Sequence, residues 1–336
     1  MVRLARDRHS GKERGAYLTH PHGTVAGSSA ILRLVVAAAR EIHPGRSPGN
    51  LRNRARVIYR GIRYRKLLQR FCDRLARLET VRPVLARPDL LGVIDWPYLN
   101  NAWDVAARLD RIATHYELLA ASSSKLLTAD RNTPLRLFDL SRITPGCAII
   151  VDAAAWFKRE GELVLNLFKE DLRVASIAFI LGIESGSRTI LVGAIQGIHA
   201  GVPSEQSLEI YRQLTKDFEG LRPRSLLLEV LRMMGHSLQV STLLAIADEN
   251  RHHRHPYFGA AGSSKLGTSY NQIWLEHGGI QSLVPGFYEI PILPSRKEPG
   301  DIPAKKRAMY RRRYAILAEM EKEISAALAA GGSAQQ

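Results

Sequence analysis

The sequence contains only two cysteines in 336 residues, Cys72 and Cys147, and they lie far apart. Two isolated cysteines exclude a disulfide framework and a zinc knuckle, so we expect both to be small buried residues in a reducing compartment. No uncharged apolar run reaches the roughly 18 residues that a membrane-spanning helix needs. The basic N-terminus also lacks the apolar core of a secretory signal. These absences predict a cytoplasmic protein, either free or attached peripherally to the inner membrane.

Several catalytic signatures are missing as well. The sequence has no P-loop, no GxSxG elbow, no HExxH pair and no Rossmann fingerprint, so kinase, α/β-hydrolase, zincin and dehydrogenase functions are disfavoured. It has no recognisable DNA-binding motif either, which makes nucleic acid the least favoured anionic partner. Composition alone therefore leaves open whether the protein is an enzyme.

Acidic residues are scarce relative to basic ones. The chain has 32 Asp and Glu against 48 Lys and Arg, for a formal net charge of +16, which suggests an anionic ligand or membrane surface as partner. The excess is concentrated in residues 1–74, with 17 Lys and Arg against four acidic residues. Helical spacing places Leu51, Ala55, Ile58 and Ile62 on one apolar face. We expect that face to pack into the core, with the arginines opposite it solvated or in contact with membrane head groups.

The hydropathy pattern changes along the chain from helical to strand-like and back. Period-two alternation and Gly-Ser punctuation between residues 135 and 198 predict three or four antiparallel strands. Two further strands are expected at 240–248 and 286–293. The segments expected to be helical are 30–39, 102–121, 204–218, 223–235, 269–277 and 304–329.

This order predicts an α+β fold in which a helical N-terminal region precedes a mixed, mostly antiparallel sheet flanked by helices. The corresponding regions are a basic, poorly ordered N-terminus (1–26), a helical region (27–130), an α+β domain (131–295), and a basic C-terminal helix with its tail (296–336).

Five sequence segments occur in an order that is familiar. They are HYELL (115–119), EGELVLNLF (160–168), LVGAIQG (191–197), GLRPRSLLLEVLR (220–232), and SYNQIWLEHGG with GFYEIP (269–279 and 286–291). Together they resemble the VirK/YbjX family of bacterial proteins, a domain of unknown function, over most of the chain. The sequence departs from the family in its more basic N-terminus and in Asn271, where we expect an aspartate. The resemblance implies a role in the cell envelope or in virulence of Gram-negative bacteria, and it implies no established reaction.

The order of elements is also similar to that of GNAT-type N-acyltransferases. In such folds a meander strand leads to a helix whose N-terminus receives the pyrophosphate of the cofactor, because free backbone N–H groups and the helix dipole favour anions there. The residues at the corresponding positions are Gln196, Gly220, Arg222 and Arg224, and the arginines would add charge-assisted phosphate contacts. The GNAT loop has a Gly-x-Gly/Ala core where this chain has Arg-Pro-Arg. A proline-started helix with two solvated arginines is the alternative.

Three residues are candidates for acid–base catalysis in this arrangement. His199 follows the end of the meander strand, where the acyl group would react, and an imidazole titrates near neutral pH. Tyr270 and Glu276 lie on the short helix before Gly278-Gly279. The alternatives are a surface histidine near a turn and, for Tyr270 with Trp274, two core residues on one helix face.

The basic run that follows the strand at 240–248 is the last candidate. Arg251, His253 and Arg254 are suited to an anionic ligand, since ligands collect at the carboxyl ends of strands in α/β folds. Three histidines within 252–255 also suggest a metal. Because adjacent histidine side chains are expected to diverge, and zinc needs ligands that converge from separate positions, we predict no metal site.

Two functions follow from these patterns. The first is an acyltransferase that uses acyl-CoA or an acyl carrier protein to modify an envelope component. The second is a non-enzymatic peripheral membrane factor, held by the basic N-terminal helices, that supports envelope assembly or stress resistance.

Overall fold

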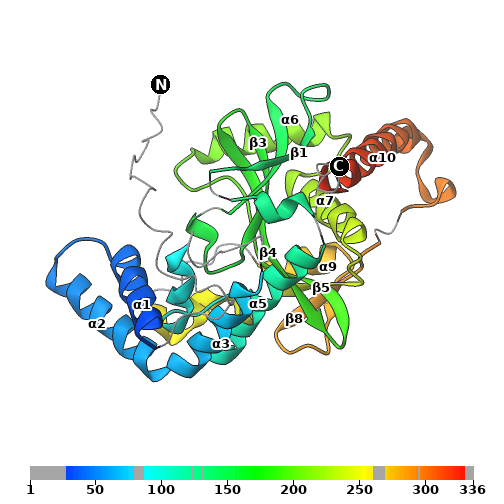
Figure 1. Cartoon of the computed structure of the whole chain (residues 1–336). Helices are drawn as coiled ribbons and strands as arrows, with labels where there is room; N and C mark the ends of the chain where they lie inside the picture. The colour runs from blue at the N-terminus through cyan, green and yellow to red at the C-terminus, as the bar shows by residue number, and fades with distance from the viewer. Residues whose placement is uncertain are drawn as a thin grey trace, which may run out of the picture. The chain divides into compact units, whose positions relative to one another are not determined.

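A computed structural model describes residues 28–78, 87–122, 124–130, 132–153, 155–259, 269–293 and 296–329. The protein divides into two compact units, Met1–Trp96 and Pro97–Gln336 (Figure 1). None of the described helices is long and apolar enough to cross a membrane. Both cysteines are buried, as predicted. Burial, and then the charge of Asp73, raise the pKa of the Cys72 thiol to about 12, which makes this thiol unreactive.

The N-terminal unit consists of helices α1 (Ser28–Ile42), α2 (Pro48–Arg63) and α3 (Arg65–Ala76) and the 3-10 helix η1 (Pro88–Ile94). Helix α2 begins at Pro48 because the Ser47 hydroxyl accepts a hydrogen bond from the Asn50 N–H. A Cβ at Gly61 would lie 2.5 Å from a methyl carbon of Val35, so this glycine allows α1 and α2 to pack closely.

The predicted apolar face of α2 is wrong. Leu51 and Ile62 are 51% and 54% exposed, while the buried residues of the helix are Val57 and Gly61. The close approach at Gly61 rotates a different side of the helix inward. Two arginines of α2, which we expected to be solvated or in contact with head groups, instead bind Asp95. Arg56 donates two hydrogen bonds of 2.8 Å to the buried Asp95 carboxylate, and Arg60 donates to the Asp95 carbonyl oxygen.

The second unit is built on one eight-stranded sheet, which confirms the predicted α+β class with a mixed, mostly antiparallel sheet. The strand order is β1-β2-β3-β4-β5-β6-β8-β7, and the pairing of β5 with β6 is parallel. The strands are β1 (Leu135–Asp139), β2 (Cys147–Asp152), β3 (Leu163–Lys169), β4 (Leu172–Glu184), β5 (Ser187–Gln196), β6 (Thr242–Ile246), β7 (Ile280–Gln281) and β8 (Phe287–Ile290). The meander therefore has five strands, one more than the upper end of our prediction.

Helices of the second unit cover this sheet (Figure 1). They are α5 (Val105–Ala121), α6 (Ser204–Asp217), α7 (Pro223–Ser237), α9 (Tyr270–Glu276) and α10 (Arg307–Ala329). Helix α5 packs against β4, α7 against β3 and β4, and α10 against β1 and α7. The boundaries differ from prediction where capping decides them. Asp104 starts α5 three residues later than expected, since its carboxylate accepts from the Ala107 N–H.

The HYELL and EGELVLNLF segments meet in this core. Glu162 is 2% exposed, and its two carboxylate oxygens accept hydrogen bonds from the hydroxyls of Tyr98 and Tyr116. The neighbouring His115 accepts from the Leu181 N–H through Nδ1. These residues join α5 to the sheet, so their part in the structure is to hold the fold.

Candidate functional site

The candidate site lies at the carboxyl end of β5. This strand pairs with β6 as far as Val192 and Ala245, and then continues for four more residues to Gln196. Gly193 forms a bulge, because the residues on either side of it pair with consecutive residues of β4. A Cβ at Gly193 would lie 1.9 Å from the carbonyl oxygen of Glu160, so glycine is required for this close approach. The bulge therefore brings the Glu160 backbone to the end of the strand.

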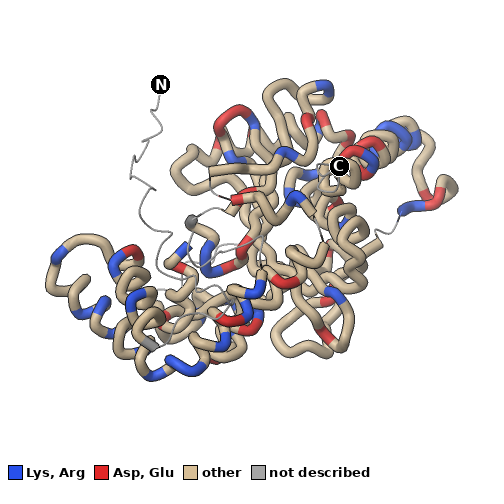
Figure 2. The backbone as a smooth tube through the Cα atoms, viewed as in Figure 1, with Lys and Arg blue, Asp and Glu red and all other residues tan. Residues whose placement is uncertain are grey.

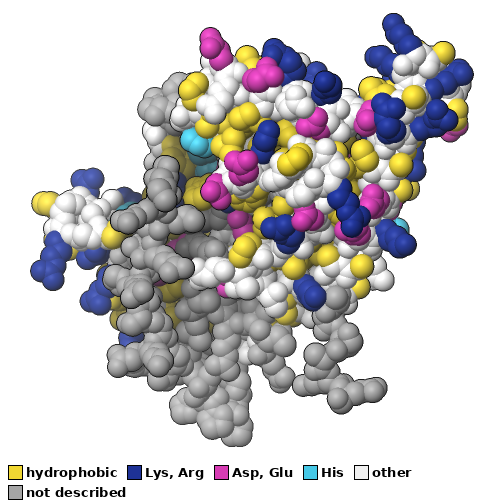
Figure 3. All heavy atoms as spheres, turned by 90° about the horizontal axis from the view of Figure 1, so that it is seen from above, with side chains coloured by type: hydrophobic (Ala, Val, Ile, Leu, Met, Phe, Trp, Pro, Cys, Tyr) yellow, Lys and Arg dark blue, Asp and Glu magenta, His cyan; other side chains and the backbone are white. Residues whose placement is uncertain are grey.

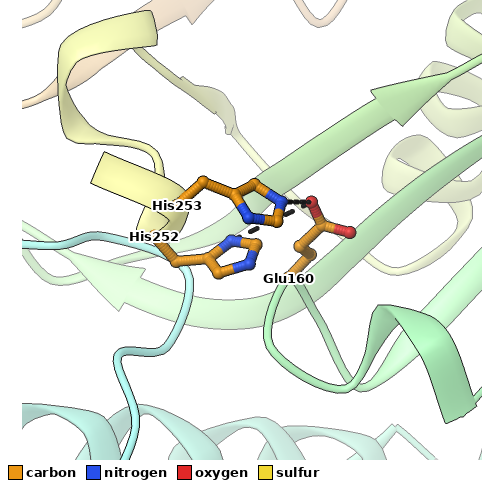
Figure 4. A group of neighbouring side chains, drawn as sticks. All are labelled: Glu160, His252 and His253. Atoms are coloured by element: carbon orange, nitrogen blue, oxygen red, sulfur yellow. Dashed lines mark ion pairs between the residues drawn. The ribbon is translucent and has the colours of Figure 1, made fainter. Parts of the chain in front are cut away.

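Glu160 is the centre of the site. Its side chain is buried, and Oε2 accepts a hydrogen bond from the Gln196 amide at 3.2 Å. Oε1 lies 3.6 Å from His253 Nε2 and 3.9 Å from His252 Nδ1 (Figure 4). Within the described residues Oε1 makes no hydrogen bond. One buried carboxylate oxygen thus faces two imidazoles at distances slightly too long for hydrogen bonds.

The two histidines do not diverge, contrary to our expectation. They lie on the short 3-10 helix η5 (His252–Arg254), and their ring centroids are 3.8 Å apart with a 40° tilt. The reason is Phe258, which lies in the next 3-10 turn, η6 (Pro256–Phe258). Its ring centroid lies 5.7 Å from that of His252 and 5.5 Å from that of His253. Packing against one aromatic ring therefore keeps both imidazoles on the side of Glu160.

Positive charge surrounds this cluster. The Arg159 guanidinium lies 5.1 Å from the Phe258 ring centroid, and Arg251 lies 3.6 Å from that of Tyr270. Burial, followed by the charges of His253, Arg159 and Arg251, holds the pKa of His252 well below its usual value. His252 is therefore neutral at physiological pH.

Tyr270 is the second buried polar group of the site. Its side chain is 1% exposed, and its hydroxyl has no hydrogen-bond partner of ordinary geometry in the described part of the chain. Burial, and then the nearby Glu160 carboxylate, raise the pKa of Tyr270, while Arg251 and Arg224 act in the opposite direction. The tyrosine consequently keeps its proton at neutral pH, and its electrostatic neighbours are the other residues of the site.

Asp248 fixes the start of the helix that carries Tyr270. Its carboxylate accepts from the Ser269 hydroxyl and from the N–H groups of Tyr270 and Asn271. Burial opposes ionisation of Asp248, but these three bonds and Arg251 outweigh it, and the pKa of the carboxyl is lowered. Asn271, in turn, accepts from the Asp248 N–H. The amide at position 271 therefore has a structural contact that does not require an acid.

The residues predicted at the start of α7 separate in the structure. Arg224 lies against β5, since a Cβ at Gly197 would be 2.8 Å from its Nη2. Arg222 is exposed and lies 3.7 Å from Glu276. Gly220 follows the C-cap of α6 with φ +81°, and a Cβ there would lie 2.7 Å from Arg313 Nη2 of α10. Of the four predicted cofactor residues, Gln196 contacts Glu160, and the charge of Arg224 acts on Tyr270.

The other predicted residues have contacts elsewhere. His199 is exposed, and its Nδ1 accepts from the Gly201 N–H in its own loop. Glu276 is exposed beside Arg222. Arg254 donates to the Asp248 carbonyl oxygen. Among the predicted residues, the described contacts thus bring together Gln196, Arg224, Arg251, His253 and Tyr270.

A second histidine contact lies near the same helix start. Ser225 Oγ and His277 Nε2 are 3.2 Å apart. Burial, and then the charge of Arg232, lower the pKa of His277 to about 4. A neutral imidazole beside a hydroxyl at the first turn of α7 is thus a further polar group close to Arg222 and Arg224.

The Glu160, His252 and His253 side chains offer one oxygen and two nitrogens to a metal ion, all within 4.8 Å of one another. Two imidazoles bound to one ion at about 2.0–2.1 Å with a tetrahedral angle have ring centres about 5 Å apart. The observed 3.8 Å is shorter, and the charges of Arg159 and Arg251 act on His252. A stacked acid–base cluster therefore fits this geometry better than a tetrahedral metal site.

The sequence reasoning missed Glu160 and His252 as site residues. Their signals were present, since Glu160 begins the EGELVLNLF segment and His252 lies in the histidine run. What joins Glu160 to Gln196 and to the histidines is the sheet topology, across separations of 36 and more than 90 residues. Periodicity within a segment carries no information on such contacts.

The fold and the site define an α+β protein with a mixed eight-stranded sheet and a buried polar cluster at the end of its parallel strand pair. The model of a family described as protein of unknown function (DUF535) matches residues 46–326, and the chain belongs to this family. The resemblance drawn from the five motifs is thereby confirmed.

Curated relatives are similar over much of their length. The uncharacterized protein YbjX of Escherichia coli K12 is 27% identical over 319 residues, which cover 92% of this chain and 93% of that protein. An uncharacterized protein of Haemophilus influenzae is 26% identical over 227 residues, or 68% of this chain and 72% of its own. No solved structure matches the chain.

Proposed function

We propose that the unit formed by residues 97–336 is an acyltransferase that accepts a thioester-bound acyl group from acyl-CoA or an acyl carrier protein. The observation that carries the proposal is the convergence of buried Glu160, His253 and buried Tyr270 at the point where β6 stops pairing with β5. Buried titratable groups with opposed roles are typical of catalytic sites.

In the proposed reaction each of these side chains has a role. An acceptor amine or hydroxyl attacks the thioester carbonyl, a new C–N or C–O bond forms, and the C–S bond breaks. Glu160, directly or through His253, takes the proton that the acceptor loses. Tyr270, which keeps its proton at neutral pH, donates a hydrogen bond to the departing thiolate, and the protonated base gives the thiolate its proton. The thiol leaves as a neutral product, and no other reactant is required.

The start of α7 is the proposed site for the phosphates of the donor. Arg224 lies against the end of β5 and supplies positive charge next to the first turn of α7, a 15-residue helix. In this proposal the acyl chain enters beside Gln196, whose amide donates a hydrogen bond to Glu160. The acceptor would be an envelope component, as the family resemblance implies.

Thermal unfolding with added donor tests this proposal. We expect CoA, acetyl-CoA and decanoyl-CoA, or decanoyl-acyl carrier protein, to raise the midpoint of the full-length protein in a saturable way. Arg224→Ala should abolish the shift, Arg222→Ala should reduce it less, and Arg212→Ala should retain it, because Arg212 is exposed on α6 and pairs with Glu209. No shift with any donor, or equal shifts in all variants, would overturn the proposal.

One observation favours a second function, peripheral membrane attachment through the N-terminal unit. Leu51, Tyr59 and Ile62 on α2 are 51–63% exposed, and the exposed Arg52 and Arg63 lie on the same helix. Figure 2 shows basic positions along this helix. An apolar face beside basic residues is typical of interfacial helices. Vesicle flotation tests this, with binding to anionic lipid expected to weaken in salt and in the variant Leu51→Glu/Ile62→Glu. Equal flotation of wild type and variant would exclude this face.

A further inference from the structure

A cavity separate from the Glu160 cluster lies between α7, the segment after β8, and α10. Its volume is about 500 Å³, within the range of sites for small molecules. One part of its wall is apolar, and it is formed by Leu221, Met233, Ile292, Leu293 and Leu317. Leu293 is 72% exposed, so apolar surface extends to the mouth of the cavity.

The mouth of the cavity is basic. Arg296, Lys297 and Arg313 line it together with Tyr310 and Tyr314. Arg296 and Lys297 are both exposed, and neither forms an ion pair within the described residues. The charge of Arg296 acts on Glu229, although burial still raises the pKa of that carboxyl. The Lys297 N–H donates to the Tyr314 hydroxyl at 3.2 Å, which fixes the basic segment to α10. Figure 3 shows Lys and Arg side chains gathered over the start of α10.

One of the two acidic side chains of the cavity has a buried arginine as its partner, and the other lies beside a histidine. Arg232, which is 5% exposed, pairs with Glu229 and donates to the carbonyl oxygen of Pro291. Glu321 lies 3.7 Å from His236. Because Arg296, Lys297 and Arg313 outnumber Glu321, the charge that a ligand meets at the mouth is positive.

The tyrosines are poorly placed to stack on a nucleotide base. Arg313 and Lys297 lie 4.4 and 6.0 Å from the Tyr310 ring centroid, and Arg296 lies 5.6 Å from that of Tyr314. The two rings also contact each other edge to face. A nucleotide base would have to displace these cations before it could stack on either ring. The apolar wall is therefore the main contact surface for a ligand.

We propose that this cavity binds a single-chain amphiphile with an anionic head group, such as a lysophosphatidate. The acyl chain packs on Met233, Ile292 and Leu317, and the head group is bound by Arg296 and Lys297. This inference goes beyond acyl transfer at the Glu160 cluster and does not depend on it.

Calorimetric titration of the full-length protein with monomeric 14:0 lysophosphatidate tests the site. Saturable 1:1 binding is expected, with glycerol 3-phosphate and the zwitterionic 14:0 lysophosphatidylcholine binding at least tenfold more weakly. A parallel arm uses vesicles that contain phosphatidate, and binding to vesicles but not to the monomer would assign the contact to a membrane surface and overturn the proposal. Equal affinity for lysophosphatidate, glycerol 3-phosphate and lysophosphatidylcholine would also overturn the proposal.

The variants separate charge from apolar contact. Arg296→Glu/Lys297→Glu and Leu293→Asp should each weaken lysophosphatidate binding at least tenfold, and all three residues are exposed enough for the fold to tolerate the change. The matched control is Lys305→Glu/Lys306→Glu, which reverses two exposed charges outside the cavity and should change the affinity less than twofold. Arg224→Ala should leave binding unchanged, so failure here and failure of the acyltransferase proposal are distinguishable. Unaltered binding in both cavity variants would exclude the site.

Discussion

The Tyr116 hydroxyl donates a 2.9 Å hydrogen bond to Oε2 of Glu162, and this bond links helix α5 to the turn before β3. Tyr116→Phe should lower the free energy of unfolding by about 1–3 kcal/mol, because it removes a donor from a buried carboxylate. Urea denaturation measures the change. Tyr59→Phe, at a tyrosine that is 63% exposed, is the control and should change stability by less than about 0.5 kcal/mol. Similar losses in both variants would contradict a special role for the buried pair.

The bulge at Gly193 predicts a larger effect. Gly193→Ala places a methyl group 1.9 Å from the Glu160 carbonyl oxygen, so the backbone must shift and stability should fall by about 3 kcal/mol or more. Gly49→Ala is the matched control. Among the described residues, no atom outside the local helix backbone and the two chain neighbours lies within 4 Å of a Cβ at Gly49, in the first turn of α2. Alanine there should stabilise by a few tenths of a kcal/mol to about 1 kcal/mol. A neutral Gly193→Ala variant would show that the Glu160 turn is not fixed by this contact.

Part of the fold and of the candidate site could be predicted from the sequence alone. Strand and helix segments were predictable from periodicity, and the proline at the start of α7 marked its first residue. The buried side of α2 was not, because it is decided by one glycine that packs on Val35 of another helix. The acid–base cluster was half found. Gln196, His253 and Tyr270 were selected from their segments, whereas Glu160 reaches them through pairings of β3, β4 and β5 that no local pattern records.

The low pKa of His277 predicts a dependence of stability on pH. The folded protein lowers this pKa to about 4, mainly through burial and Arg232, from an ordinary value near 6.5. The unfolded chain therefore binds more protons between these values, and stability should fall as the pH falls from about 6.5 toward 4. The contribution of His277 is on the order of 2 kcal/mol. His252, whose pKa is also lowered, acts with the same sign.

Urea denaturation at pH 7.5, 6, 5 and 4.5 measures this dependence. His277→Gln should flatten the curve without abolishing it, since His252 remains. Gln272→Ala, at an exposed residue whose side chain does not titrate, should leave the slope unchanged. A wild-type protein that gains stability on acidification over this interval would contradict the prediction.

The stacked geometry of His252 and His253 predicts that metal removal has little effect. Dialysis against EDTA should shift the thermal midpoint by less than about 1 °C, whereas loss of a structural ion would cost several kcal/mol. Elemental analysis of the purified protein can contradict this prediction. Stoichiometric zinc or iron that is lost in His253→Ala but retained in His236→Ala would replace the acid–base assignment with a metal site.

Tyr270 should separate stability from catalysis. Its hydroxyl is buried without an ordinary hydrogen bond in the described residues, so Tyr270→Phe should leave the free energy of unfolding unchanged or raise it slightly. If Tyr270 donates a hydrogen bond to the leaving thiolate, the same variant should lower the rate of acyl transfer by about 10²- to 10³-fold at unchanged donor affinity. Phe287→Leu, at another buried aromatic side chain of the sheet, is expected to do the reverse and reduce stability first. Tyr270→Phe with full activity would remove the tyrosine from the mechanism, and a variant that is both inactive and unstable would assign it to the core.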